Sequence, residues 1–364
     1  MVIFVFFKIS NFYFIILFQI LFFLISLNAY SLKDYEETVN LEKVLKKDDF
    51  NFYEMSDWDD NDNIIFSDGQ TIKILNSKLE KSNLLINSKE NFFYKPSFLT
   101  KNKVVFISKN KDDYILNIYS TDQKKILNSI ANVSDYYFSN KTNEIYFISS
   151  NEIGIFNLNK NEKTSFIKFN KQAFYIGKSI FIDEKDRNIY YVLNSDKKPF
   201  YPVIYKTNVI TKKLVVIYEL KNSSSDRRID YISLSSDNKL LVFLNTVGIS
   251  SLEILDISDK KMTCCFVKTI SGGEINGNPL IVNVIDKSLF TKNSKNIFFI
   301  GGFYNEKDIF QTRLYKVNIE SKKLDIIKNT IDIRKFSISK KNTKIMFFQK
   351  DKYLQWNLIV KDYN

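Results

Sequence analysis

The feature that most constrains this fold is a short apolar run that recurs along the chain after a polar turn. In its clearest copy, the run Leu240 to Leu244 follows the turn Ser235 to Lys239, and the β-favouring run Tyr231 to Leu234 precedes that turn. A strand, a tight turn and a second strand predict a β-hairpin. Two further runs, Leu252 to Ile257 and Met262 to Ile270, extend the unit to four antiparallel strands. Four strands in about 40 residues is the size of one β-propeller blade.

Six more copies of the apolar run occur, at a spacing that is regular early in the chain and longer later. They begin at Ile64, Val104, Ile145, Ile189, Ile297 and Ile345. With the copy at Leu240 they make seven repeats. One such repeat cannot bury its apolar faces alone, whereas a closed ring of repeats can. We therefore predict an all-β, seven-bladed β-propeller of four-stranded antiparallel blades. A six-bladed ring, with the first unit packed differently, is the alternative.

Three segments of the repeats resemble a known repeat family. They are Ser233 to Phe243, Phe336 to Phe347 and Pro96 to Phe98. A small residue, a polar turn and an apolar strand ending in Phe are similar to the repeat of the TolB-type, WD40-like propellers. In that family the turn reads Ser-Pro-Asp-Gly-Lys, and the corresponding turns of this chain lack both the Ser-Pro and the Asp-Gly pair. The resemblance implies a propeller fold and leaves the activity open, because propellers host many unrelated functions.

Residues 1–31 have the composition of a secretory signal peptide. They contain no acidic residue, one cationic residue, Lys8, and an apolar run from Phe12 to Leu27 that only Gln19 interrupts. Small residues precede an expected cleavage site after Ser31. The alternative is an uncleaved signal anchor, which would tether the protein to the membrane through residues 12–27. In both cases Lys8 favours export of the rest of the chain, to the periplasm or the outer face of the membrane.

The rest of the chain, residues 32–364, is expected to form a single propeller domain. The last repeat, Arg334 to Val360, supplies only three strands. The segment 38–46 resembles the final strands of other repeats, so we predict that it pairs with the last blade as its outermost strand and closes the ring. Deletion of residues 32–47 should then abolish soluble folding.

Loop lengths suggest which face binds. In a blade, turns between the first two strands lie on one face, and connections between the second and third strands and between blades lie on the other. The second class is long at 194–202, 221–228, 271–279 and 301–311. These loops fit a recognition surface, although tolerated insertions would have similar lengths. The residues expected to contact a partner are Phe200, Tyr201, Arg227, Arg228, Glu274, Asn276 and Tyr304.

Residues with catalytic or metal-binding chemistry are scarce. The chain has no His, which removes the commonest general base, the common nucleophile systems and the commonest zinc ligand. The acidic stretch Asp57 to Asn63, with Asp68, alternates like a calcium loop but lacks its Gly and Glu positions. Cys264 and Cys265 are neighbours and form no disulfide framework. We predict no catalytic residues, no metal site and no cofactor.

The formal net charge of +12 comes almost entirely from Lys residues spread through turns. Such a spread is not typical of a nucleic-acid groove, and export removes most nucleic acid from reach. The sequence therefore favours a non-catalytic platform that binds a protein or peptide of the cell envelope. Two alternatives remain open: a hydrolase or lyase with carboxylates or Tyr at the central channel, and a sensor of a small ligand or an ion.

Overall fold

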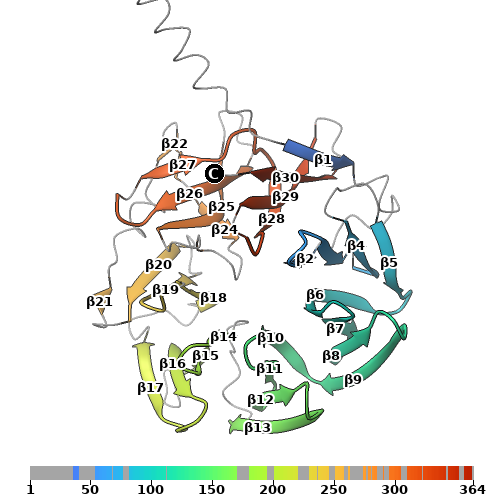
Figure 1. Ribbon diagram of the computed structural model, residues 1–364. Coiled ribbons are helices and arrows are strands. Elements are labelled where there is room, and N and C mark those ends of the chain that lie inside the picture. The colour runs from blue at the N-terminus through green and yellow to red at the C-terminus, as the bar shows by residue number, and fades with distance from the viewer. Residues whose placement is uncertain are drawn as a thin grey trace, which may run out of the picture.

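The computed structural model arranges the strands as seven four-stranded antiparallel sheets around a common axis (Figure 1). The structure describes residues 36–40, 54–67, 69–76, 82–111, 113–169, 180–194, 201–219, 229–235, 237–245, 251–257, 261–262, 274–275, 278–279, 281–284, 290, 295–304, 310–321, 323–341, 343–351 and 356–362. The predicted all-β, seven-bladed fold is confirmed, and the six-bladed alternative is wrong. Among these described residues no helix is long and apolar enough to cross a membrane. The predicted export segment, 1–31, lies outside them.

The first four blades follow the chain order, each from its innermost to its outermost strand. Blade 1 contains β2 (Glu54–Trp58), β3 (Ile64–Ser67), β4 (Thr71–Leu75) and β5 (Ser82–Asn87). Blade 2 contains β6 (Phe92–Thr100), β7 (Lys103–Asn110), β8 (Asp113–Ser120) and β9 (Lys125–Ala131). Blade 3 contains β10 (Val133–Ser139), β11 (Glu144–Ser149), β12 (Glu152–Asn157) and β13 (Glu162–Lys168). Blade 4 contains β14 (Ile180–Asp183), β15 (Asn188–Asn194), β16 (Pro202–Asn208) and β17 (Leu214–Glu219).

The remaining three blades complete the ring. Blade 5 contains β18 (Ile229–Leu234), β19 (Leu240–Asn245), β20 (Ser251–Asp256) and β21 (Lys261–Met262). A two-stranded hairpin, β22 (Glu274–Ile275) and β23 (Asn278–Pro279), precedes blade 6. Blade 6 contains β24 (Ile281–Val284), β25 (Asn296–Tyr304), β26 (Phe310–Asn318) and β27 (Leu324–Ile326). Blade 7 contains β28 (Ile333–Ile338), β29 (Lys344–Lys350), β30 (Trp356–Asp362) and β1 (Glu36–Asn40).

The recurring apolar run forms the second strand of every blade. All four residues from Ile145 to Ile148 in β11 are fully buried, and so are those from Ile297 to Ile300 in β25. Both faces of these strands are apolar because each blade packs between two neighbouring blades. The Phe and Tyr side chains at these positions fill the space between blades, as the sequence predicts.

The turns between first and second strands depend on a small polar residue at the end of the first strand. Ser235 Oγ accepts the N–H of Leu240 at 2.9 Å, and Ser339 Oγ accepts the N–H of Lys344 at 3.1 Å. Where the family's turn has Gly, Asn143 and Asn238 adopt left-handed backbones with φ of 53° and 57°. Asn tolerates this conformation better than most residues, so the turn persists without the Asp-Gly pair.

Ring closure comes from the N-terminal side of the chain. Strand β1 pairs antiparallel with β30 from Glu36 opposite Lys361 to Asn40 opposite Asn357. The expected strand was 38–46; the observed strand starts two residues earlier, and residues 41–46 lie outside the described part. This pairing supplies the fourth strand of blade 7 and covers the free edge of β30.

Candidate functional site

Strand direction defines two faces of the ring. The first strand of each blade runs from the face that carries the inter-blade connections to the face that carries the turn before the second strand. We call these the long-loop face and the turn face. The connection between β25 and β26 and the hairpin of β22 and β23 belong to the long-loop face, and β23 contacts β25. The described ends of two of the four long loops, 271–279 and 301–311, therefore lie on this face.

The predicted contact residues are only partly covered by the structure. Phe200, Arg227, Arg228 and Asn276 lie outside the described residues. Tyr201 is half-buried immediately before β16. The backbone of Glu274 lies in β22, opposite Pro279, and the backbone of Tyr304 ends β25, opposite Phe310. The hairpin and the end of β25 are thus neighbours, while the remaining predicted contacts stay predictions.

Around the axis, two of the innermost strands carry carboxylates that join blades: Asp135, which sequence analysis did not single out, and Asp57, which belongs to the acidic stretch noted there. Asp135 in β10 is fully buried, and its Oδ1 lies 2.6 Å from Nζ of Lys95 in β6. Its Oδ2 accepts the backbone N–H of Ile180, the first residue of β14, at 3.0 Å. One carboxylate therefore links blades 2, 3 and 4. The hydroxyl of Tyr136 adds a hydrogen bond to the carbonyl of Lys95.

A second inner-strand carboxylate has a similar role between blades 1 and 2. Asp57 Oδ2 in β2 accepts the backbone N–H of Phe98 in β6 at 3.2 Å. Its Oδ1 accepts the N–H of Trp58 at 2.9 Å. Both carboxylates thus stabilise backbone N–H groups at blade junctions. Carboxylates engaged in this way hold a scaffold together and are poorly placed to transfer protons to a substrate.

A tyrosine beside these carboxylates is held protonated. Burial, followed by the negative charges of Glu184 and Asp57, raises the pKa of Tyr137. Its ring packs against Phe181 with centroids 5.0 Å apart. A phenol with a raised pKa does not ionise near neutral pH and cannot serve there as a general base.

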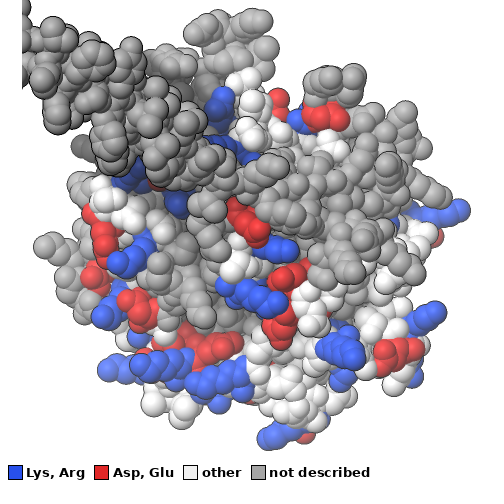
Figure 2. All heavy atoms as spheres, turned by 45° about the horizontal axis from the view of Figure 1, so that its top comes forward, with Lys and Arg blue, Asp and Glu red and all other residues white. Residues whose placement is uncertain are grey.

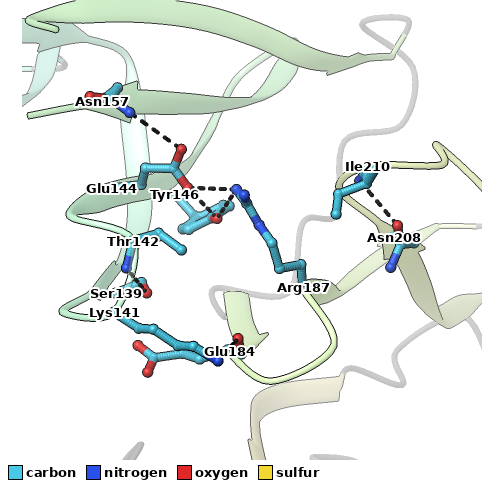
Figure 3. Close-up of polar contacts among 10 residues, drawn as sticks. All are labelled: Ser139, Lys141, Thr142, Glu144, Tyr146, Asn157, Glu184, Arg187, Asn208 and Ile210. Atoms are coloured by element: carbon cyan, nitrogen blue, oxygen red, sulfur yellow. Dashed lines mark hydrogen bonds and ion pairs between the residues drawn. The ribbon is translucent and has the colours of Figure 1, made fainter. Parts of the chain in front are cut away.

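The turn face is joined across blades 3 and 4 by a polar cluster (Figure 3). Nη2 of Arg187 lies 2.8 Å from Oε2 of Glu144 and 3.3 Å from the hydroxyl of Tyr146. The Tyr146 hydroxyl also donates to the same Glu144 oxygen at 2.7 Å. Nζ of Lys141 donates to the carbonyl of Glu184 at 3.3 Å. These contacts connect the turn of blade 3 to the turn of blade 4.

The same face has further contacts between neighbouring turns. Nδ2 of Asn238 donates to Oδ1 of the buried Asp183 at 2.7 Å, between blades 5 and 4. Nζ of Lys341 lies 3.6 Å from Oδ2 of Asp62, between blades 7 and 1. Sequence analysis missed these pairs. For the contact of Arg187 with Glu144, the one available signal was an Arg at the position that is Gly in the TolB-type repeat.

The acidic stretch that resembles a calcium loop forms an ordinary turn. Asp59 Oδ1 accepts the N–H groups of Asn61 and Asn63, each at 2.8 Å. Its Oδ2 accepts Nδ2 of Asn63 at 2.6 Å. These bonds use the carboxylate within the turn. Within the described part of the chain, His, Cys, Asp and Glu form no group of three that could hold a metal ion.

Surface charge does not form a single basic area in the view of Figure 2, where Lys and Arg side chains lie among Asp and Glu side chains. Nucleic-acid grooves have clustered positive charge. The described residues in this view show no such cluster.

Comparison with known proteins identifies the fold. No family model and no curated protein sequence matches the chain. Among solved structures, the tricorn protease is similar with a TM-score of 0.53 and 13% identity over 88% of this chain and 33% of that one. A chain of the mitotic checkpoint complex is similar with a TM-score of 0.56 and 9% identity. The match covers 90% of this chain and 93% of that one.

A third similar structure is the extracellular domain of the putative one component system BT4673 from B. thetaiotaomicron. Its TM-score is 0.59, with 11% identity over 91% of this chain and 40% of that one. This chain thus spans about a third of the tricorn chain and two fifths of the BT4673 chain. At such low identity these similarities establish the propeller fold alone.

Proposed function

We propose that this protein is an exported, non-catalytic propeller that serves as a binding platform for a protein or peptide of the cell envelope. The observation that carries the proposal is the contrast between its two faces. On the turn face, Arg187, Asn238 and Lys341 join neighbouring blades. The long-loop face carries the extended connections. A rigid scaffold with extended loops on one side suits recognition.

The inner strands support a platform in preference to an enzyme. Among their described carboxylates, Asp57 and Asp135 each accept a backbone N–H from the next blade. An enzyme of the kind considered above would need carboxylates that converge on a substrate. We also propose that the chain is a divergent member of the TolB-type propellers, on the basis of its repeat turns.

The direction of β1 gives the proposed platform an orientation. Strand β30 runs from the long-loop face to the turn face, and Glu36 pairs with Lys361 near its end. The chain therefore enters β1 at the turn face. Residues 28–35 can span at most about 28 Å when extended. If residues 12–27 anchor the protein, the membrane lies on the side of the turn face, and the long-loop face is free to bind partners.

The platform proposal is tested by cross-linking in intact cells followed by capture of the tagged full-length protein. In one variant a short turn replaces Ser271 to Pro279, which include the β22 and β23 hairpin. In the control a short turn replaces residues 121–124, between β8 and β9 on the turn face. Specific envelope proteins should be captured by the wild type and the control and lost from the first variant. Equal capture by all three proteins would refute the long-loop face as the binding surface.

The orientation is tested separately. The starting protein is a variant that lacks the two native Cys residues. A single Cys replaces either Lys185 on the turn face or Lys89 on the long-loop face, both of which are exposed. Each protein is labelled in intact spheroplasts with a bulky maleimide. We expect faster labelling at position 89 than at position 185. Equal rates at the two positions would contradict a membrane beside the turn face.

A further inference from the structure

Blade 7 carries three cations at its long-loop end. Arg334 lies one residue from the start of β28, Lys335 follows it, and Lys350 ends β29. The backbone N–H of Lys350 donates to the carbonyl of Asp332 at 3.1 Å, so these strand ends are adjacent. Both strand ends lie on the long-loop face, because β28 begins there and β29 ends there. We call these three residues the blade-7 cationic cluster.

Trp356 organises two of the three cations. The guanidinium carbon of Arg334 lies 4.7 Å from the centroid of the Trp356 ring, and Nζ of Lys350 lies 6.0 Å from it. Trp356 is 8% exposed, so these side chains share one nearly buried aromatic surface. Cation–π contacts orient a cation without neutralising its charge.

Lys335 lies in a β-bulge with a left-handed backbone. The register of β28 and β29 shifts between Arg334 and Phe336, so Lys335 is the bulged residue. Its φ is 36°, in the left-handed region that favours Gly. A β-bulge redirects a side chain from the regular pleat and is frequent beside binding sites. The bulge lies in the innermost strand, next to the axis of the ring.

The acidic residues that the structure describes leave the three cations of the cluster without ion-pair partners. None of the three cations forms an ion pair with a carboxylate in the described part of the chain. The nearest acidic residues in sequence are Asp332 and Asp351, and Asp351 accepts Nδ2 of Asn357 at 3.3 Å. Three cations that lack such partners attract an anionic group from solution.

From this arrangement we infer that the blade-7 cationic cluster binds an acidic segment of the platform's polypeptide partner. The inference rests on the proposed function and names the chemistry of that partner. The guanidinium of Arg334 can form two parallel hydrogen bonds to one carboxylate. Lys335 and Lys350 supply point charges for further carboxylates. The formal net charge of +12 adds a long-range attraction for acidic polypeptides.

The test measures binding of fluorescein-labelled hexaglutamate to the full chain by fluorescence polarisation at low ionic strength. Lys335→Gly removes one charge and relieves the left-handed backbone, so folding is preserved. Lys111→Gly is the matched control, because Lys111 is exposed, has φ of 53° and lies in the turn between β7 and β8, also on the long-loop face. Arg334→Gln removes the guanidinium, and circular dichroism checks its folding.

We expect Lys335→Gly to raise the Kd for hexaglutamate about fivefold and Arg334→Gln to raise it about tenfold. Lys111→Gly should leave it unchanged, and added salt should weaken wild-type binding. An unchanged Kd in both cluster variants, or an equal rise in the control, would overturn the inference. The inference would also be overturned if the wild type bound a labelled oligothymidylate more tightly than hexaglutamate and the two cluster variants abolished that binding. The ligand would then be a phosphate polymer.

The capture experiment separates failure of this inference from failure of the platform. If replacement of 271–279 abolishes capture of the partner while Lys335→Gly and Arg334→Gln leave it intact, the platform stands and the acidic-segment inference fails. Loss of the partner from the two cluster variants as well supports both.

Discussion

Arg187 reaches across a blade junction to Glu144, with Nη2 2.8 Å from Oε2, although its own backbone is left-handed with φ of 52°. A left-handed backbone is costly for a residue other than Gly or Asn. Arg187 thus adopts a strained backbone at the position that is Gly in the TolB-type repeat, which this turn resembles. The ion pair and the contact with Tyr146 offset that strain by joining blades 3 and 4.

Replacement of Arg187 separates these two effects. The side chains of Arg187 and Glu144 are 32% and 13% exposed, so solvent weakens the pair only in part. We expect Arg187→Ala to lower the free energy of unfolding by about 1 to 2 kcal/mol. Arg187→Gly loses the same pair but relieves the backbone, so it should be less destabilising than Ala by about 1 kcal/mol. Urea unfolding measures both, and a Gly variant less stable than the Ala variant would contradict the role of strain.

Asp135 should be the most sensitive carboxylate of the inner strands. Asp135→Ala leaves the N–H of Ile180 and the ammonium of Lys95 without this acceptor in the interior of the ring. We expect a loss of about 3 kcal/mol or more in the free energy of unfolding, measured with urea. Asp60→Ala is the control, because Asp60 is exposed, and its effect should stay within about 0.5 kcal/mol. Similar losses in the two variants would disprove a special role for Asp135.

Gly154 packs against an aromatic ring that leaves no room for a side chain. A Cβ at this position would overlap the ring of Phe147, which faces it across β11 and β12. We expect Gly154→Ala to destabilise the protein by about 1 to 3 kcal/mol through overpacking. In the double variant with Phe147→Leu, the loss should be smaller than the sum of the two single losses. Additive losses in thermal or urea unfolding would show that the Phe147 ring is not the reason that position 154 requires Gly.

Tyr315 is a buried tyrosine whose hydroxyl has no hydrogen-bond partner in the described structure. Burial raises its pKa to about 12, and nearby Arg313 lowers it in part. Tyr315→Phe removes the unsatisfied hydroxyl, so we expect the free energy of unfolding at pH 8 to rise by about 1 kcal/mol. A variant less stable than the wild type would point to a hydrogen bond that the hydroxyl makes in solution.

The same tyrosine predicts alkaline sensitivity. Below pH 10 it is protonated in both folded and unfolded chains, so it adds no pH dependence. Between pH 10 and about 12 the unfolded chain releases the proton while the folded chain retains it, and stability falls as the pH rises. Urea unfolding at pH 9 and pH 11 should show a smaller loss in Tyr315→Phe than in the wild type. Identical losses would mean that other groups control the alkaline transition.

The repeat pattern by itself determined the architecture. Apolar runs starting at Ile64, Ile145 and Leu240 become second strands that begin within one residue of those positions. Period and hydrophobicity are local properties, and seven apolar units that cannot be stable alone leave a closed ring as the solution. The sequence also predicted that an N-terminal strand would close the ring, with its start misplaced by two residues.

Tertiary structure decided which polar side chains meet. Arg187 and Glu144 are 43 residues apart, and Asp135 and Ile180 are 45 apart. These contacts depend on how one blade is rotated against the next. The placement of Lys335 depends in turn on the β-bulge that it occupies. No local pattern encodes these inter-blade relations, because they arise from the packing of whole sheets. The sequence thus specified the ring, packing between its blades assigned the carboxylates to the scaffold, and strand pairing within blade 7 gathered its cations on one face.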